Sequence, residues 1–236
     1  MTYNIHKGFG GVDRRYRPER VIEAISHCRA DIVLLQEVDD GAPRSRNHRQ
    51  VDLLGDALGF PHRAYQRNVA LSKGHYGNAI LSRFPLSDVH RLNLTVPLKK
   101  RRGGLAAHCL IRFEGHSRTV LLFNAHLGLA AVERRIQLRR FLKSDLLRHT
   151  HKNTAVIAAG DFNDVWGNLG RQVLEPTGFK TALGPVKTFP AVLPMRPLDR
   201  IYYRGGLSVD HGFASRTKVA RRASDHLPLV VDFVIS

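Results

Sequence analysis

Polar side chains that could carry acid–base or metal chemistry stand at the ends of several apolar segments of this chain. Asn4 lies in the run TYNIH, Glu37 in LLQEVD and His126 in NAHLG. The same pattern places Asp161 and Asn163 in AGDFND, Asp199 in LDRIYY, and Asp225 with His226 in SDHLPL. A carboxylate or amide at the end of a buried strand is costly unless it is paired or holds a ligand. We therefore expect these side chains to converge on one cleft.

The donor types in this set indicate a hard divalent cation. The set offers four carboxylates (Glu37, Asp161, Asp199 and Asp225), two amides (Asn4 and Asn163) and two imidazoles (His126 and His226), but no thiolate. Oxygen-rich donor sets suit Mg²⁺ or Mn²⁺ better than Zn²⁺. The two imidazoles could then stabilise or protonate phosphoryl oxygens. The pattern thus favours phosphate-ester chemistry with Mg²⁺ as the cofactor and Mn²⁺ as a possible substitute.

The charge balance points to an anionic partner. Lysine and arginine total 37 against 20 acidic residues, which gives a formal charge of +17. A charge this far from zero predicts attraction to nucleic acid, an anionic membrane surface or phosphorylated substrates, without choosing among them. The densest basic run, Lys99 to Arg102, is expected at an exposed turn over Lys99–Gly104, where a solvated hairpin tip is the alternative to a binding surface.

Several classes of protein are excluded by composition. Cys28 and Cys109 have neither metal-site nor disulfide-framework spacing, which is typical of buried thiols in a reducing compartment. No apolar run approaches the roughly 18 residues of a membrane span, and the N-terminus lacks the apolar segment of a secretory signal. We expect a soluble, cytoplasmic protein without a transmembrane segment, acting as a monomer.

Short β-branched runs alternate with amphipathic stretches, and no linker divides the chain, so a single domain over residues 1–236 is expected. In the helix expected over Val132–Leu147, one apolar face is formed by Val132, Ile136, Leu142 and Leu146. The other helices are expected at Pro18–Cys28 and Gln50–Leu58. Strands are expected at Met1–His6, Asp31–Glu37, Asn78–Ser82, Leu105–Phe113, Thr119–Ala125, Ala155–Ala159, Asp199–Tyr203 and Leu229–Ile235. Because strands outnumber helices and several could pair as hairpins, this pattern favours an α+β sandwich.

The ordered motifs resemble one known superfamily over nearly the whole chain. TYNIH, LLQEVD, GNAILS, NAHLG, AGDFND, LDRIYY and SDHLPL, in this order, are similar to the endonuclease/exonuclease/phosphatase superfamily with its DNase I-like fold. The combination of GDFN with a C-terminal SDH before a strand is the part of this pattern that is specific for the superfamily. The stretches NIHKGF, HYGNAILSRFP, HLGL and KTFPAVLPMRPLDRIY resemble a bacterial group typified by a protein encoded beside a cardiolipin synthase. The implied fold is a four-layer α/β/β/α sandwich of two mostly antiparallel, mixed sheets flanked by helices.

The resemblance also implies a role for each site residue. Glu37 would be the main metal ligand, with Asn4 and Asp225 close to the metal or its waters. Asp161, held by Asn163, would orient or deprotonate the attacking water. The remaining residues would act on the phosphate: His226 oriented by Asp199, His126 on a non-bridging oxygen, and Asn78 as part of the phosphate seat. Whether Asp161 or His226 is the general base stays open, as does the placement of His6 near the site.

The resemblance implies a Mg²⁺-dependent phosphodiester hydrolase. A nuclease of the endonuclease type acting on nucleic acid is the first reading, and a phosphodiesterase acting on phospholipids or head groups at anionic membranes is the alternative. Abasic-site repair is disfavoured, because no aromatic residue stands in Arg196–Leu198, directly before the orienting Asp199. Only three residues precede Asn4, which makes the first strand short for this fold and leaves open whether native N-terminal residues are missing.

Overall fold

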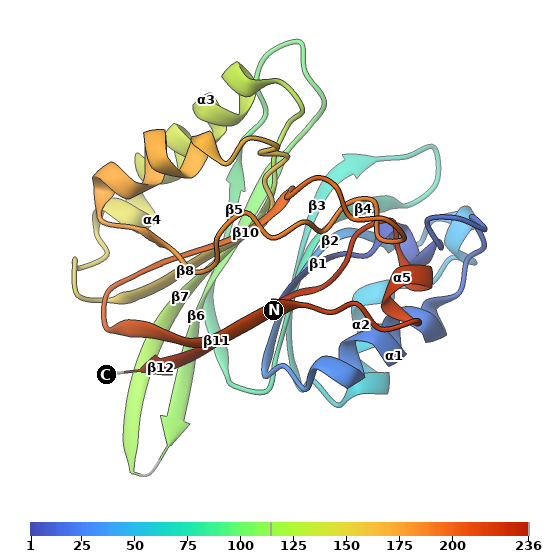
Figure 1. Cartoon of the computed structure of the whole chain (residues 1–236), viewed down its shortest axis with the longest axis horizontal. Coiled ribbons are helices and arrows are strands. Elements are labelled where there is room, and N and C mark those ends of the chain that lie inside the picture. Colours follow the sequence, from blue (N-terminus) through green and yellow to red (C-terminus); the bar gives the residue numbers. More distant parts are fainter. Residues whose placement is uncertain (114, 236) are drawn as a thin grey trace.

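Two six-stranded sheets pack face to face, and helices cover both outer faces (Figure 1). The structure is a computed structural model and describes residues 1–113 and 115–235. The first sheet has the order β11 (Leu207–Ala214), β12 (Leu229–Ile235), β1 (Thr2–Asn4), β2 (Ile32–Asp40), β4 (His75–Ser82) and β3 (His62–Ala70). The second has the order β5 (Leu86–Asn93), β6 (Gly103–Phe113), β7 (His116–His126), β8 (Ala155–Asp161), β10 (Asp199–Arg204) and β9 (Lys180–Thr181).

Both sheets are mixed and mostly antiparallel. The parallel pairs are β1 with β2 and β7 with β8. On the outer face of the first sheet lie α1 (Pro18–Cys28), α2 (Gln50–Leu58) and α5 (Ala220–Ala223), and over the second lie α3 (Ala131–Leu142) and α4 (Asp145–Arg148). Short turns of helix occur at His6–Gly8, Pro43–Ser45, Gly170–Leu174 and Glu175–Thr177. The four-layer α/β/β/α sandwich expected from the sequence is confirmed.

Three apolar layers hold the sandwich together. One lies between the two sheets and includes Leu34, Ile80, Leu105 and Leu122. The other two lie between each sheet and its own helices. Successive side chains of a strand point to opposite faces, so each inner strand contributes alternate residues to two of these layers. Burial on both faces explains why the inner strands have continuous apolar sequences.

All eight expected strands are present among the described residues. The four further strands there, β3, β5, β9 and β11, are the edges of the two sheets. An edge strand has one unpaired side and tolerates charged residues, so its apolar pattern is weak. The first strand is shorter than expected: it ends at Asn4, and His6 opens a 3₁₀ turn. Conversely, β6 begins at Gly103, inside the turn expected over Lys99–Gly104.

The helix expected over Val132–Leu147 is wrong in length and in orientation. It ends at Leu142, and Ser144 caps a separate short helix by accepting a hydrogen bond from the Leu147 amide. Val132 is 64% exposed, whereas the buried face includes Gln137. The Gln137 side chain accepts a hydrogen bond from the Gly128 amide, so a polar contact with the loop after β7 sets the rotation of α3.

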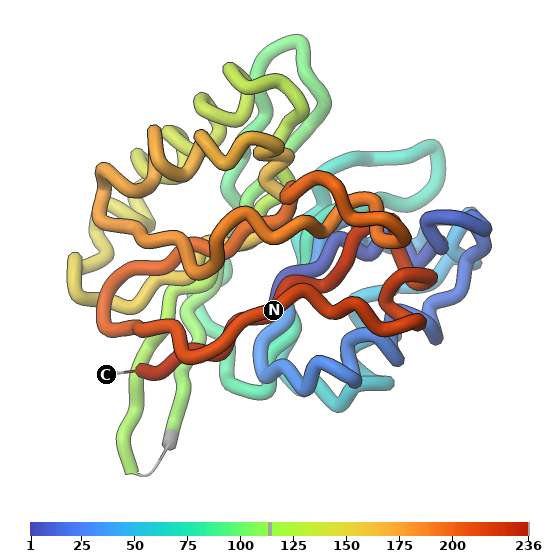
Figure 2. Tube along the Cα trace, viewed as in Figure 1, coloured from blue at the N-terminus to red at the C-terminus, as the bar shows by residue number. Residues whose placement is uncertain are grey.

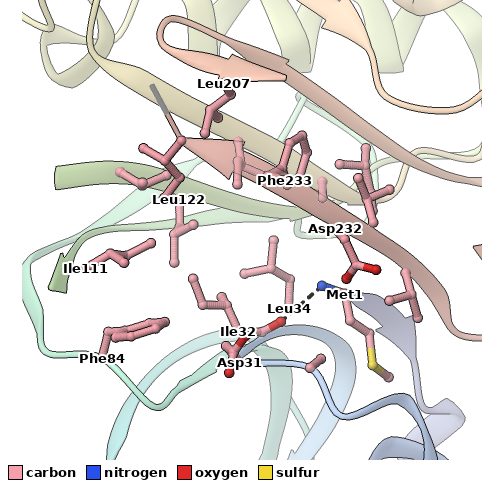
Figure 3. Close-up of a pocket in the computed structure, with 18 of the residues that line it drawn as sticks. Met1, Asp31, Ile32, Leu34, Phe84, Ile111, Leu122, Leu207, Asp232 and Phe233 are labelled. Atoms are coloured by element: carbon pink, nitrogen blue, oxygen red, sulfur yellow. Dashed lines mark hydrogen bonds between the residues drawn. The ribbon is translucent and has the colours of Figure 1, made fainter. Parts of the chain in front are cut away.

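A mostly apolar cavity of about 510 Å³ opens between the sheets at the start of β2 and the end of β12 (Figure 3). β1 begins only at Thr2, so β2 and β12 extend past it on this side. The buried ammonium of Met1 donates a hydrogen bond to the Ile32 carbonyl, 3.0 Å away. The amine of Met1 therefore lies at the lining of this mostly apolar cavity.

Candidate active site

The register of the second sheet brings the predicted site residues to one edge. His126 at the end of β7 pairs with Asp161 at the end of β8, and Asp161 pairs with Asp199 at the start of β10. On the first sheet β1 ends at Asn4, whose amide nitrogen donates to Asp161 Oδ2 at 3.0 Å. This buried contact joins the two sheets at what we call the site edge: the ends of β1, β7 and β8 and the starts of β6 and β10.

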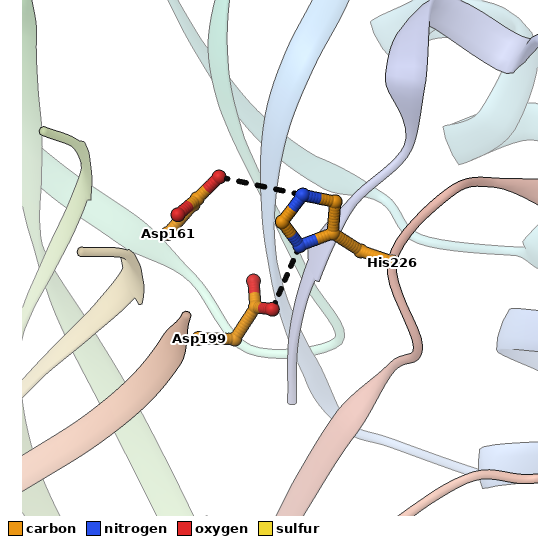
Figure 4. A group of neighbouring side chains, drawn as sticks. All are labelled: Asp161, Asp199 and His226. Carbon is orange, nitrogen blue, oxygen red and sulfur yellow. Dashed lines mark hydrogen bonds and ion pairs between the residues drawn. The ribbon is translucent and has the colours of Figure 1, made fainter. Parts of the chain in front are cut away.

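Asp199, His226 and Asp161 form a continuous buried chain (Figure 4). His226 Nδ1 lies 2.8 Å from Asp199 Oδ2, and its Nε2 lies 3.6 Å from Asp161 Oδ2. The Thr188 hydroxyl donates to the same Asp199 oxygen at 2.5 Å. Asp199 is therefore fixed from two sides and holds one imidazole nitrogen, while the other nitrogen faces Asp161.

A second imidazole approaches Asp161 from β7. His126 Nε2 lies 3.5 Å from Asp161 Oδ2, and its Nδ1 lies 3.9 Å from Glu37 Oε1. His126 is 7% exposed and Asp161 is 2% exposed. One carboxylate oxygen of Asp161 is thus surrounded by two imidazoles and the Asn4 amide.

Glu37 reaches the site because β2 is irregular at this position. Leu35 and Val38 pair with Ala79 and Gly77 of β4, so Gln36 and Glu37 lie opposite a single residue. Such a bulge redirects a side chain. Glu37 has a φ of 56°, a left-handed conformation that costs free energy in a residue other than glycine and is concentrated at functional sites.

The titratable groups have separated pKa values. For Glu37, burial opposes ionisation, but two cations outweigh it and lower the pKa to about 2: Lys7, and His126 in its protonated form, which is present in the acidic range where Glu37 titrates. Burial is also the main reason why the pKa of His126 falls to about 4. Burial has the same effect on His226, but Asp199 and Asp161 outweigh it and raise the pKa of His226 to about 10. At neutral pH the site therefore holds a carboxylate at Glu37, a neutral imidazole at His126 and an imidazolium at His226.

The other predicted residues lie around this centre. Asn163 donates its backbone N–H to Asp161 Oδ1 at 3.0 Å, and its side chain donates to the Leu127 carbonyl. Asp225 lies farther out, with Oδ1 at 3.9 Å from His6 Nδ1. These contacts place Asn163 directly behind Asp161 and both His6 and Asp225 at the rim.

Asn78 is fully buried on β4 and holds the start of β6. Its amide nitrogen donates to the Gly103 carbonyl at 3.0 Å, and its oxygen has no protein partner among the described residues. A direct role for Asn78 on a phosphate stays a prediction.

A family comparison agrees with this geometry. A model of the "Endonuclease/Exonuclease/phosphatase family" matches residues 1–226. The chain belongs to this family. Its members are phosphoesterase hydrolases, and the buried acidic and histidine cluster is of the kind that can hold a divalent metal.

One relative and two solved structures match almost the whole length of this chain. The uncharacterized protein YbhP of Escherichia coli K12 is 32% identical over 242 residues, which cover 97% of this chain and 93% of YbhP. An endonuclease/exonuclease/phosphatase of Beutenbergia cavernae has a TM-score of 0.80 at 22% identity, covering 99% of this chain and 70% of that one. The mannosyl-6-phosphatase Bt3783 of Bacteroides thetaiotaomicron has a TM-score of 0.75 at 18% identity, covering 99% and 98%. The two structures establish the shared fold.

The donor chemistry fits a divalent cation. Glu37 remains ionised although it is largely buried, and its Oε2 is paired with the ammonium of Lys7, so this carboxylate already attracts a positive charge. Asp161, Asp199 and His226 offer three further donor atoms within 4.8 Å of one another. Asp199 Oδ2 is occupied by Thr188 and His226, however, whereas Glu37 Oε1 lies 3.9 Å from His126 Nδ1, so this oxygen is the more available of the two.

Three residues near the site were not found from the sequence. Lys7 pairs with Glu37, and Thr188 holds Asp199. Arg102, expected at an exposed turn, is only 9% exposed; its buried Nε has no partner among the described residues, and its charge contributes to lowering the pKa of His126. No sequence pattern marks Lys7 or Thr188, because each contacts its carboxylate only in the folded chain.

Proposed function

We propose that this protein is a Mg²⁺-dependent phosphodiester hydrolase that also accepts Mn²⁺. The observation that carries the proposal is the buried chain from Asp199 through His226 to Asp161 and Asn4, with His126 on the same Asp161 oxygen. In the proposed reaction water forms a bond to phosphorus, and the bond from phosphorus to the leaving alkoxide breaks. The water loses one proton and the alkoxide gains one.

The charge state of each group supports a role in this reaction. Asp161 accepts a hydrogen bond from Asn4 and is suited to orient or deprotonate the attacking water. His226, which is charged at neutral pH, can donate from Nε2 to a phosphoryl oxygen while Asp199 holds Nδ1. His126 can hold a non-bridging oxygen, Asn163 fixes Asp161, and Asn78 helps to form the phosphate seat.

Glu37, with Asn4 and Asp225 nearby, is the proposed site for Mg²⁺. When bound, the ion would supply positive charge to the phosphoryl group and the leaving oxygen. Lys7 contributes an ammonium at the same carboxylate. The protein's own part is to keep Glu37 ionised and turned toward Lys7 and His126.

Two substrate classes remain for the proposed reaction. The excess of 37 basic over 20 acidic residues supports nucleic acid, cleaved as by an endonuclease. The resemblance to the bacterial group encoded beside a cardiolipin synthase supports a phospholipid or head-group phosphodiester. Among the described residues no helix has the length and hydropathy to cross a membrane. We also propose that the protein is cytoplasmic, because its two cysteines, Cys28 and Cys109, are both free thiols.

A substrate panel tests the proposed reaction. We expect hydrolysis of a simple activated phosphodiester with Mg²⁺ or Mn²⁺ and loss of that activity in EDTA, because Glu37 would have no cation to hold. Plasmid DNA, RNA and phospholipid vesicles are compared under the same conditions, and duplex DNA competes with anionic vesicles in one cleavage assay. Full activity in EDTA would contradict the metal-dependent reaction.

A further inference from the structure

The described residues expose ten large apolar side chains, and most of them lie beside the active site. Phe213 and Val234 belong to β11 and β12. The other eight follow a strand that ends at the site edge or precede one that begins there: Val12, Leu98, Leu129, Val132, Trp166, Val192, Leu193 and Met195. Exposed apolar groups that gather on one side of a protein mark an interaction surface.

Each of four connections at the site edge has an exposed apolar side chain. Leu98 is 104% exposed in the connection from β5 to β6, which stands out beside α3 (Figure 2). Leu129 is 76% exposed directly after β7, and Trp166 is 81% exposed after β8. Leu193 is 67% exposed at the tip of the turn closed by the Phe189–Arg196 bridge. Strand register brings the flanking residues His126, Asp161 and Asp199 together, so these connections leave from neighbouring strand ends around one site.

Two of these four connections, residues 94–102 and 187–197, carry positive charge, and none of the four has an exposed carboxylate. Residues 94–102, 127–132, 162–169 and 187–197 contain a single acidic residue, Asp164, which is 2% exposed and accepts a hydrogen bond from the Leu169 amide. Lys99, Lys100 and Arg101, which we call the basic tip, are exposed next to Leu98. The surface is therefore apolar and cationic together.

We propose that the site edge docks on an anionic phospholipid bilayer, with the apolar tips entering the interface and the basic tip contacting lipid phosphates. Aliphatic side chains such as Leu98 and Leu193 gain free energy when they leave water for a bilayer. Each basic residue near an anionic surface adds to the attraction. A nucleic acid backbone would satisfy the cations but would give the aliphatic side chains nothing to contact. This proposal deepens the proposed function and rests on it, because docking brings the site edge to a phosphodiester in the lipid head group.

Trp166 provides the measurement, because it is the only tryptophan of the chain. We expect its emission to shift to shorter wavelength and the protein to sediment with vesicles of mixed phosphatidylglycerol and phosphatidylcholine, measured in EDTA so that no lipid is consumed. Phosphatidylcholine vesicles alone should produce neither effect. Absence of both effects with the anionic vesicles would overturn the proposal, as would quenching by duplex DNA that also displaces the vesicles.

Variants separate the apolar and the charged contributions. Leu98→Ser should weaken vesicle binding by at least about fivefold. The matched control Val234→Ser, also on an exposed apolar residue but on β12, should leave it unchanged. Replacing Lys99, Lys100 and Arg101 together by Gln should weaken binding by about a hundredfold at low salt. Equal binding by wild type, Leu98→Ser and the triple variant would overturn the proposal.

The binding and turnover measurements can fail independently. A wild-type protein that binds anionic vesicles but hydrolyses no phosphodiester would contradict the proposed function and leave the docking surface in place. One that hydrolyses a small phosphodiester but does not bind the vesicles would contradict only the docking surface. Arg102 stays unaltered in these variants because it is buried beside His126.

Discussion

Glu37→Gln should reduce phosphodiester hydrolysis by at least about a hundredfold, which corresponds to roughly 2.7 kcal/mol of transition-state stabilisation. The substitution keeps the shape of the side chain but removes the charge that is expected to anchor the cation. High Mg²⁺ should restore part of the activity, because binding is weakened while the other donors remain. The measurement is kcat/KM for a small phosphodiester over a range of Mg²⁺ concentrations.

Two controls distinguish this effect from a loss of folding. Glu23→Gln makes the same chemical change on an exposed residue of α1 and should keep full activity. Glu37→Gln also leaves the Lys7 ammonium without its carboxylate, so the double variant with Lys7→Met tests whether an unpaired charge destabilises the protein. Full activity of Glu37→Gln would reject Glu37 as the anchor.

Asp199→Asn, His226→Ala and the double variant should have similar residual rates, each at least about a hundredfold below wild type. The 2.8 Å contact makes the two residues one unit, and removing either member of such a unit disables both. Single-turnover rates of all three variants provide the measurement. Losses that multiply in the double variant would show that the two residues act independently.

A titration gives a readout that does not depend on turnover. Asp199 is the largest of the contributions that raise the pKa of His226, so Asp199→Asn should lower that pKa from about 10, as followed by NMR of the imidazole nitrogens. Asp210→Asn, on an exposed residue of β11, is the matched control and should leave the pKa unchanged. An unchanged pKa in Asp199→Asn would contradict the orienting role of Asp199.

The strands could be predicted from the sequence to the extent that they are buried on both faces. β8, with AVIAAGD, is paired on both sides and is continuous in its apolar residues. β5, with LSDVHRLN, pairs only with β6 and carries charge at Asp88 and Arg91. The prediction of the helix over Val132–Leu147 was wrong for a related reason. Gln137 is buried because it accepts a hydrogen bond and not because it is apolar, so the apolar pattern gave the wrong buried face.

The sequence by itself determined the donor types, their order along the chain and the inner strands that carry them. Only the tertiary structure decided that Asn4 contacts Asp161 across 157 residues, that Lys7 pairs with Glu37, and that Arg102 is buried while the basic tip is exposed. The physical reason is that each depends on register and on the approach of two sheets. A bulge of one residue turns Glu37, and no local pattern encodes which side chains then meet.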